Sequence, residues 1–259
     1  MSALVLSAKL WAMTAHTSRA FEAELRDLKT RLLAMGGRCE QLIRMASRAL
    51  EERDANLAHH VEELDRAINA EEMAIDGMTI SILALRQPVG RDLRFLVTAL
   101  KVVTDLERIG DEAVNVAERA EELAGCQPIP ALQPKLHELA DASTRMVRRA
   151  LDSFVAENEQ LGREVLREDD EVDALYGEVL RESMAFMSHN PDRVQDGMRY
   201  ASCAKYLERV ADHATNIAEM VVFMVSGTDV RHFGSSSSAG VVMPADDARP
   251  PTKKASGAA

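Results

Sequence analysis

The chain of 259 residues carries 42 acidic and 31 basic side chains, which give it a formal net charge of -11. Its length suffices for one large hydrophobic core or two modest ones, and an aromatic content of only 4% suits aliphatic packing between helices. The negative charge and the lack of basic patches argue against nucleic acid and anionic lipid as partners. No uncharged apolar run approaches the ~18 residues that cross a membrane, so we expect no transmembrane segment. The three cysteines lie far apart without CxxC spacing, which is typical of a reducing compartment.

Residues 1–16 hold a short apolar stretch that is interrupted by Lys9, and they lack the basic start and the long apolar core of a secretory signal. Organised helical periodicity begins only at Phe21. We therefore expect residues 1–16 to be a flexible N-terminal extension, and we hypothesise that Met13 is the authentic start of the natural protein.

Three helical segments are predicted in residues 17–125. Apolar residues recur at alternating steps of four and three over 21–50 and again over 57–85, which is the pattern of long helices packed against near-parallel neighbours. Proline and glycine in residues 88–90 indicate the turn that follows. A third seam, rich in alanine, runs over 96–120, so we predict a first three-helix bundle.

The second half repeats this organisation. Residues 126–134 contain too many prolines for a helix and are predicted to be a linker. Residues 135–227 are predicted to form a second three-helix bundle, and residues 228–259 have the composition of a flexible tail. The predicted helices of this half run over 135–157, 159–189 and 191–227. The predicted fold class is therefore all-α, with two tandem pseudo-repeated three-helix bundles, six long helices and a disordered C-terminal tail.

Two segments of fourteen residues repeat each other. DLERIGDEAVNVAE at 105–118 and YLERVADHATNIAE at 206–219 share 8 of 14 residues at a fixed offset of 101. Side chains with oxygen atoms recur in both copies at spacings of four, four and three, which places them within an arc of roughly 80° on a helix. These are Glu107, Asp111, Asn115 and Glu118 in the first copy, and Glu208, Asp212, Asn216 and Glu219 in the second. Each copy therefore predicts one polar stripe that faces away from the core.

The helix before the first stripe carries its own acid pair, Glu72 and Asp76. In an antiparallel hairpin, residues at the same height have numbers with a constant sum. Glu72 is then level with Asp111, and Asp76 with Glu107, if the chain folds back between residues 91 and 92. We expect these four carboxylates to lie at matching heights on adjacent helices.

The second half has the same arrangement. Its acid pair is Asp169 and Asp173, and the same arithmetic places Asp169 level with Asp212, and Asp173 level with Glu208. The corresponding fold-back lies between residues 190 and 191. Two sets of four carboxylates follow the logic of carboxylate metal sites in helical bundles.

Ligands that are all oxygen atoms favour hard cations, namely Mg²⁺, Ca²⁺, Mn²⁺ and ferric iron. The rival explanation is ion pairing along each helix, of Arg108 with Asp111 or Glu112 and of Arg209 with Asp212. The duplication and the level pairing favour metal binding over this explanation.

The two repeated segments, together with RQPVGRDLRFL at 86–96, resemble the signature segments of the PhoU family over about residues 17–227. The resemblance implies two three-helix bundles whose E(D)xxxD motifs bind multinuclear metal clusters at the surface. The ions considered are iron, manganese, magnesium, zinc and calcium. The implied ligands are Glu72, Asp76, Glu107 and Asp111 for one site, and Asp169, Asp173, Glu208 and Asp212 for the other. Additional candidate ligands that match the signature are Asn115, Glu118, Asn216 and Glu219.

The resemblance also implies a cytoplasmic regulator of phosphate uptake, held peripherally at the inner membrane by its partners. The implied partners are the ATP-binding subunit of a phosphate ABC transporter and a phosphate-sensing histidine kinase, and a homodimer is expected. Its implied role is negative regulation of the phosphate-starvation response.

Two alternatives from other classes stay open. A carboxylate-bridged metal enzyme would be expected to use the Glu-x-x-His motif, but no histidine of the sequence has a glutamate three residues earlier. His213 follows Asp212 directly and points ~100° away from the stripe, which indicates a surface or packing role. The sequence also lacks a phosphate-binding glycine loop and a nucleophile elbow. We therefore predict that the protein is not an enzyme, with a purely structural helical interaction module as the other alternative.

Overall fold

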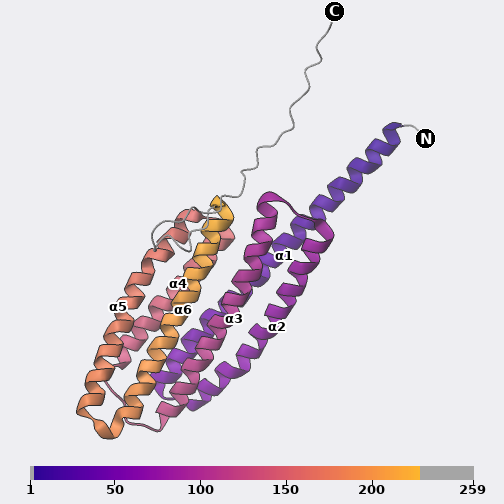
Figure 1. Cartoon of the computed structure of the whole chain (residues 1–259). Coiled ribbons are helices and arrows are strands. Elements are labelled where there is room, and N and C mark those ends of the chain that lie inside the picture. Colours follow the sequence, from indigo (N-terminus) through magenta and orange to yellow (C-terminus); the bar gives the residue numbers. More distant parts are fainter. Residues whose placement is uncertain (1–2, 228–259) are drawn as a thin grey trace, which may run out of the picture.

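The computed structural model describes the backbone of residues 3–227 and the side chains of residues 19–227. This part of the chain forms six α-helices and one short 3-10 turn and contains no strand (Figure 1). The helices are α1 (Ala3–Glu52), α2 (Ala55–Arg86), α3 (Gly90–Ala124), α4 (Gln133–Ala156), α5 (Glu159–His189) and α6 (Val194–Ser226). The all-α prediction is confirmed, and the predicted tail at 228–259 lies outside the described residues.

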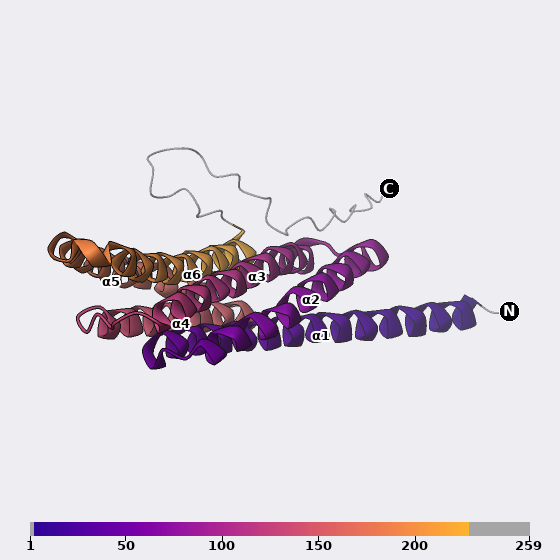
Figure 2. The same cartoon turned by 90° about the horizontal axis from the view of Figure 1, so that it is seen from below.

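Each half of the chain is a bundle of three long helices. The helices α1 to α3 contact one another, as do α4 to α6, and the two halves meet where α1 lies against α4 and α3 lies against α6. Figures 1 and 2 show the six helices running along one common long axis. The buried apolar side chains form one continuous cluster that extends through both halves. The two predicted bundles therefore share a single core.

The seams predicted from the periodicity line this core. In α1 the side chains of Leu28, Leu32 and Met35 are fully buried, as are those of Ile68 and Ile75 in α2. Burying one such side chain contributes about 1.5–3 kcal/mol to the free energy of folding. The helices are held in place mainly by these apolar faces, because isolated helical propensity in water is marginal.

Polar residues and left-handed residues set the helix ends. The Asp54 carboxylate accepts a hydrogen bond from the backbone N–H of Asn56 (2.9 Å), and Asn158 Oδ1 accepts one from the N–H of Leu161 (3.2 Å). Gln87 has φ 48° and ends α2 directly before Pro88. This turn positions α3 against α2, which is where the first predicted site lies.

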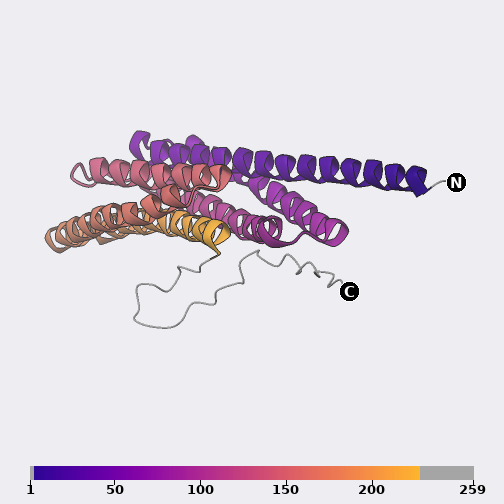
Figure 3. The ribbon, with the colours of Figure 1, turned by 90° about the horizontal axis from the view of Figure 1, so that it is seen from above.

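The expectation of a flexible N-terminal extension at 1–16 is wrong from Ala3 onward, because α1 begins there and passes through Met13 without a break. Figure 3 shows this end of α1 projecting beyond the other helices. Alanine, leucine, methionine and lysine dominate the segment, and these residues have high helix propensity. The helix therefore continues past the first residues that have a core to face.

The linker is slightly shorter than predicted, since α4 begins at Gln133 instead of after Pro134. Proline is tolerated in the first turn of a helix, where its missing N–H leaves no hydrogen bond unmade. None of the described helices has an apolar stretch long enough to cross a membrane.

Candidate metal sites

The two signature segments lie against each other where α3 crosses α6. Arg209 Nη1 on α6 lies 3.1 Å from Glu112 Oε1 on α3, and His213 Nδ1 lies 2.9 Å from Asp105 Oδ1. Lower residue numbers on one helix thus pair with higher ones on the other, so the two helices are antiparallel here. Both polar stripes are consequently brought to the middle of the molecule.

A surface groove of about 850 Å³ lies between the two stripes. Its predicted lining residues are Asp111, Asn115, Asp169, Asp212, Asn216 and Glu219. It is also lined by Arg108, Glu112, Arg209, His213 and Thr215. The sequence predicted two separate acidic surfaces, whereas the structure places parts of both around one groove.

The acids of the second-half set lie on α5 and α6, on either side of one turn. After α5 the chain folds back through Asn190 and a 3-10 turn that starts at Pro191, which confirms the predicted position of the turn. Burial and the neighbouring charges of Asp173, Asp212 and Glu208 together raise the pKa of Asp169 to about 6. The three neighbouring carboxylates are therefore close enough to oppose the ionisation of Asp169.

Two neighbours moderate this repulsion in part. Lys205 Nζ lies 2.5 Å from Glu208 Oε2, and its positive charge opposes the rise in the pKa of Asp212 that burial and Glu208 cause. His213 acts on Asp212 in the same direction as Lys205, although its ring pairs with Asp105. This agrees with the packing role expected of His213.

The first-half set differs from the prediction. The turn occupies Gln87 to Val89 and α3 begins at Gly90, so the fold-back predicted between residues 91 and 92 is wrong. The predicted pairing would place Gly110 opposite Met73, but the nearest side chains to Gly110 are those of Asp65 and Ile68. The left-handed conformation of Gln87, followed by Pro88, fixes the position of the turn. The predicted pairing of residues across the hairpin was instead based only on the positions of the acids.

All four predicted acids of this half still interact, Asp76 through Glu72. Burial and then the charge of Asp111 raise the pKa of Glu107, and the carboxylates of Glu72 and Asp65 also raise it. The pKa of Glu72 is raised by burial, by Asp76 and by Asp111. For Asp76 only burial raises the pKa, so this residue lies at the margin of the set.

Sequence reasoning missed Asp65 and Asn69 on α2. Asp65 is buried, Asn69 Nδ2 donates a hydrogen bond to Asp65 Oδ2 (3.1 Å), and the pKa of Asp65 is raised by burial and by Asp111. A signal was present, because Asp65, Asn69, Glu72 and Asp76 follow one another at spacings of four, three and four. This is a second polar stripe, on the helix that faces the first one.

The rival explanation of ion pairing holds in part. Arg108 lies 3.5 Å from both Glu107 and Asp111, and its side chain is 58% exposed. Arg209, however, pairs across the groove with Glu112 and not with Asp212. The exposed pairs of Arg108 contribute at most about 1 kcal/mol, so they leave most of the repulsion between the acids unrelieved.

The amide side chains of the stripes donate to acids. Asn115 Nδ2 lies 3.1 Å from Glu112 Oε2, and Asn216 Nδ2 lies 3.3 Å from Asp105 Oδ1. Glu118 lies 3.2 Å from Arg119 and is not among the residues that line the groove. The amide oxygens of Asn115 and Asn216 are thus the atoms that each asparagine can offer to a cation.

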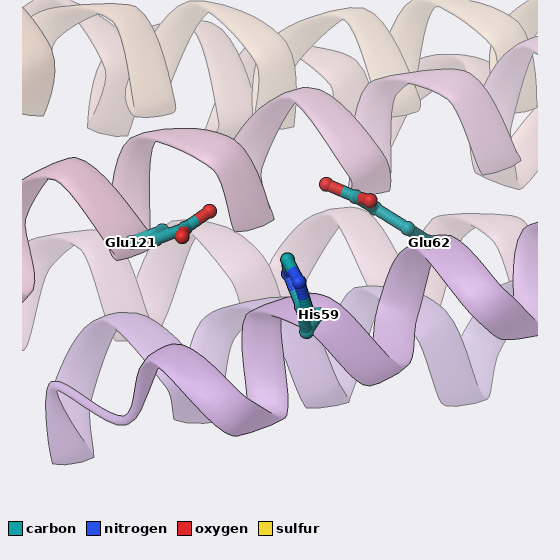
Figure 4. A group of neighbouring side chains, drawn as sticks. All are labelled: His59, Glu62 and Glu121. Carbon is teal, nitrogen blue, oxygen red and sulfur yellow. The ribbon is translucent and has the colours of Figure 1, made fainter.

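Within residues 19–227, no three of the predicted acids have ligand atoms within 4.8 Å of one another. One other group does, namely His59, Glu62 and Glu121, which join α2 and α3 near the start of α2 (Figure 4). His59 and Glu121 are exposed, and the second half has Val222 where the offset of 101 places the counterpart of Glu121. Exposed acidic groups commonly converge without an ion, so this geometry alone identifies no site.

The donor set nevertheless fits a hard cation. Oxygen atoms of Asp65 and Asp76 are buried and have no hydrogen-bond partner among the described residues. Buried anionic oxygen atoms are costly unless a donor or a cation compensates them. Carboxylates with raised pKa values and unpartnered oxygens are what a site for Mg²⁺, Mn²⁺ or iron supplies.

The comparisons with known proteins agree with the repeat. The PhoU domain matches the chain twice, over residues 32–120 and 136–221. A relative from Pseudomonas aeruginosa, the phosphate-specific transport system accessory protein PhoU homolog, is 41% identical over 223 residues, which are 86% of this chain and 92% of that protein.

Solved structures show the same architecture. The crystal structure of PhoU from Pseudomonas aeruginosa matches with a TM-score of 0.77 and 40% identity, covering 80% of this chain and 100% of that one. The phosphate transport system regulatory protein PhoU from Streptococcus pneumoniae matches with a TM-score of 0.75 and 28% identity, covering 81% of this chain and 99% of that one.

The two matched ranges fall on helices α1 to α3 and α4 to α6, so each half of the chain carries one copy of the domain. The relatives are named as accessory and regulatory proteins, which agrees with the prediction that the protein is not an enzyme. The chain belongs to the PhoU family.

Proposed function

We propose that the chain is a regulator of phosphate uptake and of phosphate-starvation signalling that acts as a metal-binding adaptor. Its relatives are named accessory and regulatory proteins of phosphate transport, which supports the general role. The observation that carries the metal-binding part is a groove between α3 and α6 that is lined by Asp111 of the first carboxylate set and by Asp169 and Asp212 of the second.

The proposed ligands are the eight acids and the four additional residues of the two stripes, with iron, manganese, magnesium, zinc or calcium as the bound ion. A bound cation would offset the burial and the repulsion that together raise the pKa values of Asp169, Asp212 and Glu107. It would also change the charge of the groove from strongly negative toward neutral, and so change which partner surface the groove can contact.

The proposed partners are the ATP-binding subunit of a phosphate ABC transporter and a phosphate-sensing histidine kinase, with negative regulation as the outcome. The proposed location is the cytoplasm, peripheral to the inner membrane through these partners, and the proposed assembly is a homodimer. The names of the relatives place them with phosphate transport systems, and this supports contact with such components.

Elemental analysis of protein purified without a metal-affinity resin tests the sites. Three double variants are compared with the wild type: Glu107→Ala/Asp111→Ala, Glu208→Ala/Asp212→Ala, and Glu62→Ala/Glu121→Ala as the control. We expect each of the first two to lose part of the bound metal while the helical circular dichroism is retained. A loss confined to the control would move the ion to His59 and its neighbours, and a wild type without any metal would reject the metal-binding role.

The partner is tested by pull-down of the ATP-binding subunit of the transporter encoded in the same genome. We expect binding that changes with phosphate or with metal, and weaker binding for both site variants. Absence of binding across all phosphate and metal conditions would contradict the adaptor role.

A further inference from the structure

A hollow of about 360 Å³ continues the groove toward the end of α6. The groove and the hollow share Asn216, and Leu100 and Met220 form the apolar wall of the hollow. Arg94 on α3 donates a hydrogen bond to the backbone oxygen of Met224 (3.1 Å), so the contact between α3 and α6 extends past the hollow almost to the end of α6. This face of α3 and α6 therefore runs from the acidic groove, across the apolar hollow, to the point where α6 ends.

The groove has an excess of negative charge. Among the described residues that line it, five are acids and two are arginines. Arg209 is already paired with Glu112, and Arg108 lies 3.5 Å from Asp111. The remaining acids give the groove a net negative charge, which favours a cationic occupant.

The part of the chain that follows α6 contains a segment with the complementary pattern. Its sequence, VVMPADDARPPTKK at 241–254, begins with three apolar residues, continues with two acids, and ends with three bases and no acid over 249–254. The hollow has an apolar wall and the base Lys101, and the groove beyond it is acidic. The order of apolar, acidic and basic residues along the segment thus matches the order of the surfaces along the face, starting from the end of α6.

The segment is attached close enough to reach both surfaces. Met220 lies seven residues before Gly227 and Asp212 fifteen, which correspond to about 10 and 22 Å along α6. The chain from Gly227 to Val241 can span up to about 45 Å. Attachment gives the segment an effective concentration on the order of a millimolar, so weak individual contacts suffice. The prolines at 250–251 restrict the backbone between the bases, which lowers the entropy lost on binding.

We propose that residues 241–254 bind to this face of their own chain, with the apolar residues 241–243 in the hollow and the bases of 249–254 in the acidic groove. The segment lies outside both ranges that match the PhoU domain, so those matches do not account for the contact. The inference does not rest on the proposed metal binding, because opposite charges and apolar contact are sufficient for it. A partner protein or a cation that enters the groove would have to displace the segment.

Trypsin cleavage of the full chain in EDTA at low ionic strength tests the contact. Trypsin cleaves after lysine, so binding of the bases to the groove slows the release of residues 255–259, which follow Lys254. We expect Asp111→Asn/Asp212→Asn to accelerate this release about fivefold or more. High salt should accelerate it in the wild type, because salt screens the contacts. Cleavage after Arg231, outside the segment, is the internal control and should change less than about twofold.

A photo-reactive amino acid in place of Met243 locates the segment. We expect cross-links to the parts of α3 and α6 around Leu100 and Met220. Val241→Ser/Val242→Ser should lower the yield of these cross-links and accelerate the release of residues 255–259, because it removes the apolar contact. A mixture of isotopically labelled and unlabelled protein shows whether each cross-link forms within one molecule.

Four outcomes would overturn the proposal. They are equal rates of release for the wild type and Asp111→Asn/Asp212→Asn, an equal acceleration after Arg231, cross-links confined to other surfaces, and cross-links that join labelled to unlabelled copies. The last of these would assign the segment to a neighbouring molecule. Because both measurements are made in EDTA, none of these outcomes bears on the proposed metal binding, which elemental analysis decides separately.

Discussion

Asp169 has the most perturbed carboxyl group of the second-half set. Burial, followed by the charges of four neighbouring acids, raises its pKa to about 6. A carboxyl group whose pKa is raised in the folded state stabilises that state at pH values below about 4, the pKa of the same group in the unfolded chain. This contribution is lost as the pH rises through about 6, because the folded state then has to ionise a group that the unfolded chain ionises at less cost.

Asp169→Asn should therefore stabilise the metal-free protein at pH 7 and have little effect at pH 4. The expected gain is about 1–2 kcal/mol at pH 7, after discounting for the partial exposure of the side chain. Urea unfolding in EDTA between pH 4 and 7.5 measures it. The control Asp152→Asn, on the exposed side of α4, should show no such trend, and parallel pH profiles for Asp169→Asn and the wild type would contradict the assignment.

Glu112 is the buried member of an ion pair between the two halves. Its residue is 7% exposed, and its oxygen atoms contact Arg209 on α6 and Asn115 on its own helix. Removing one partner of such a pair leaves an uncompensated buried charge, which costs more than the pair itself contributes.

Arg209→Ala should therefore destabilise the protein by about 1–3 kcal/mol at pH 7, a value below that of a fully buried pair because Arg209 is half-exposed. The matched control is Arg145→Ala, whose pair with Glu171 is exposed on both sides and should cost at most about 1 kcal/mol. Chemical unfolding of both variants measures these two losses in the free energy of unfolding. Equal losses would show that water solvates Glu112 when Arg209 is absent.

At the scale of the element, the adjacent glycines of α1 have different surroundings. A Cβ on Gly36 would lie 2.1 Å from Leu151 Cδ1 on α4, whereas a Cβ on Gly37 would meet nothing within 4 Å. Gly36 thus permits the close approach of α1 and α4, which joins the two halves on the side opposite the groove. Gly37 has no such role and only lowers the helix propensity of α1.

We expect Gly37→Ala to stabilise the protein by about 0.5–1 kcal/mol through helix propensity. Gly36→Ala should destabilise it by about 1–3 kcal/mol, because the buried Leu151 has to leave its position. The melting temperatures of the two variants, compared with that of the wild type, provide the test. A higher melting temperature in both variants would mean that Leu151 moves aside without an energetic cost.

At the scale of the whole molecule, the two bundles share one apolar core and meet along α1 with α4 and α3 with α6. A ligand that binds only the folded protein stabilises it by mass action. Because the core is continuous, stabilisation at one site should reach both halves.

Saturating Mn²⁺ is therefore expected to shift one cooperative thermal transition upward by an amount that corresponds to about 2–3 kcal/mol at a hundredfold excess over the dissociation constant. Differential scanning calorimetry of the wild type and of Asp169→Asn/Asp212→Asn measures this shift. Two separate transitions, only one of which responds to Mn²⁺, would show that the halves unfold independently.

The sequence predicted the parts of this protein that depend on periodicity. Leu28, Leu32 and Met35 are buried, as the spacing of the apolar residues predicted. The duplicated stripes predicted the internal repeat and the family, which the two matches of the PhoU domain confirm. The turn between the two helices that carry the second set of acids was predicted correctly, because Asn190 and Pro191 both disfavour a continuous helix there. In these segments the local pattern and the final structure agree.

Other features depended on contacts that no local pattern contains. The left-handed Gln87 moved the first turn, and with it the partner of Gly110 changed from Met73 to Asp65. The joint groove and the pair of Glu112 with Arg209 arise only because α3 and α6 cross antiparallel. By itself the sequence determined the helices, their buried faces and the acids on them, because these follow from periodicity along one chain. The tertiary structure alone decided which acids share a surface, because that depends on the relative height and direction of helices that pack far apart in sequence.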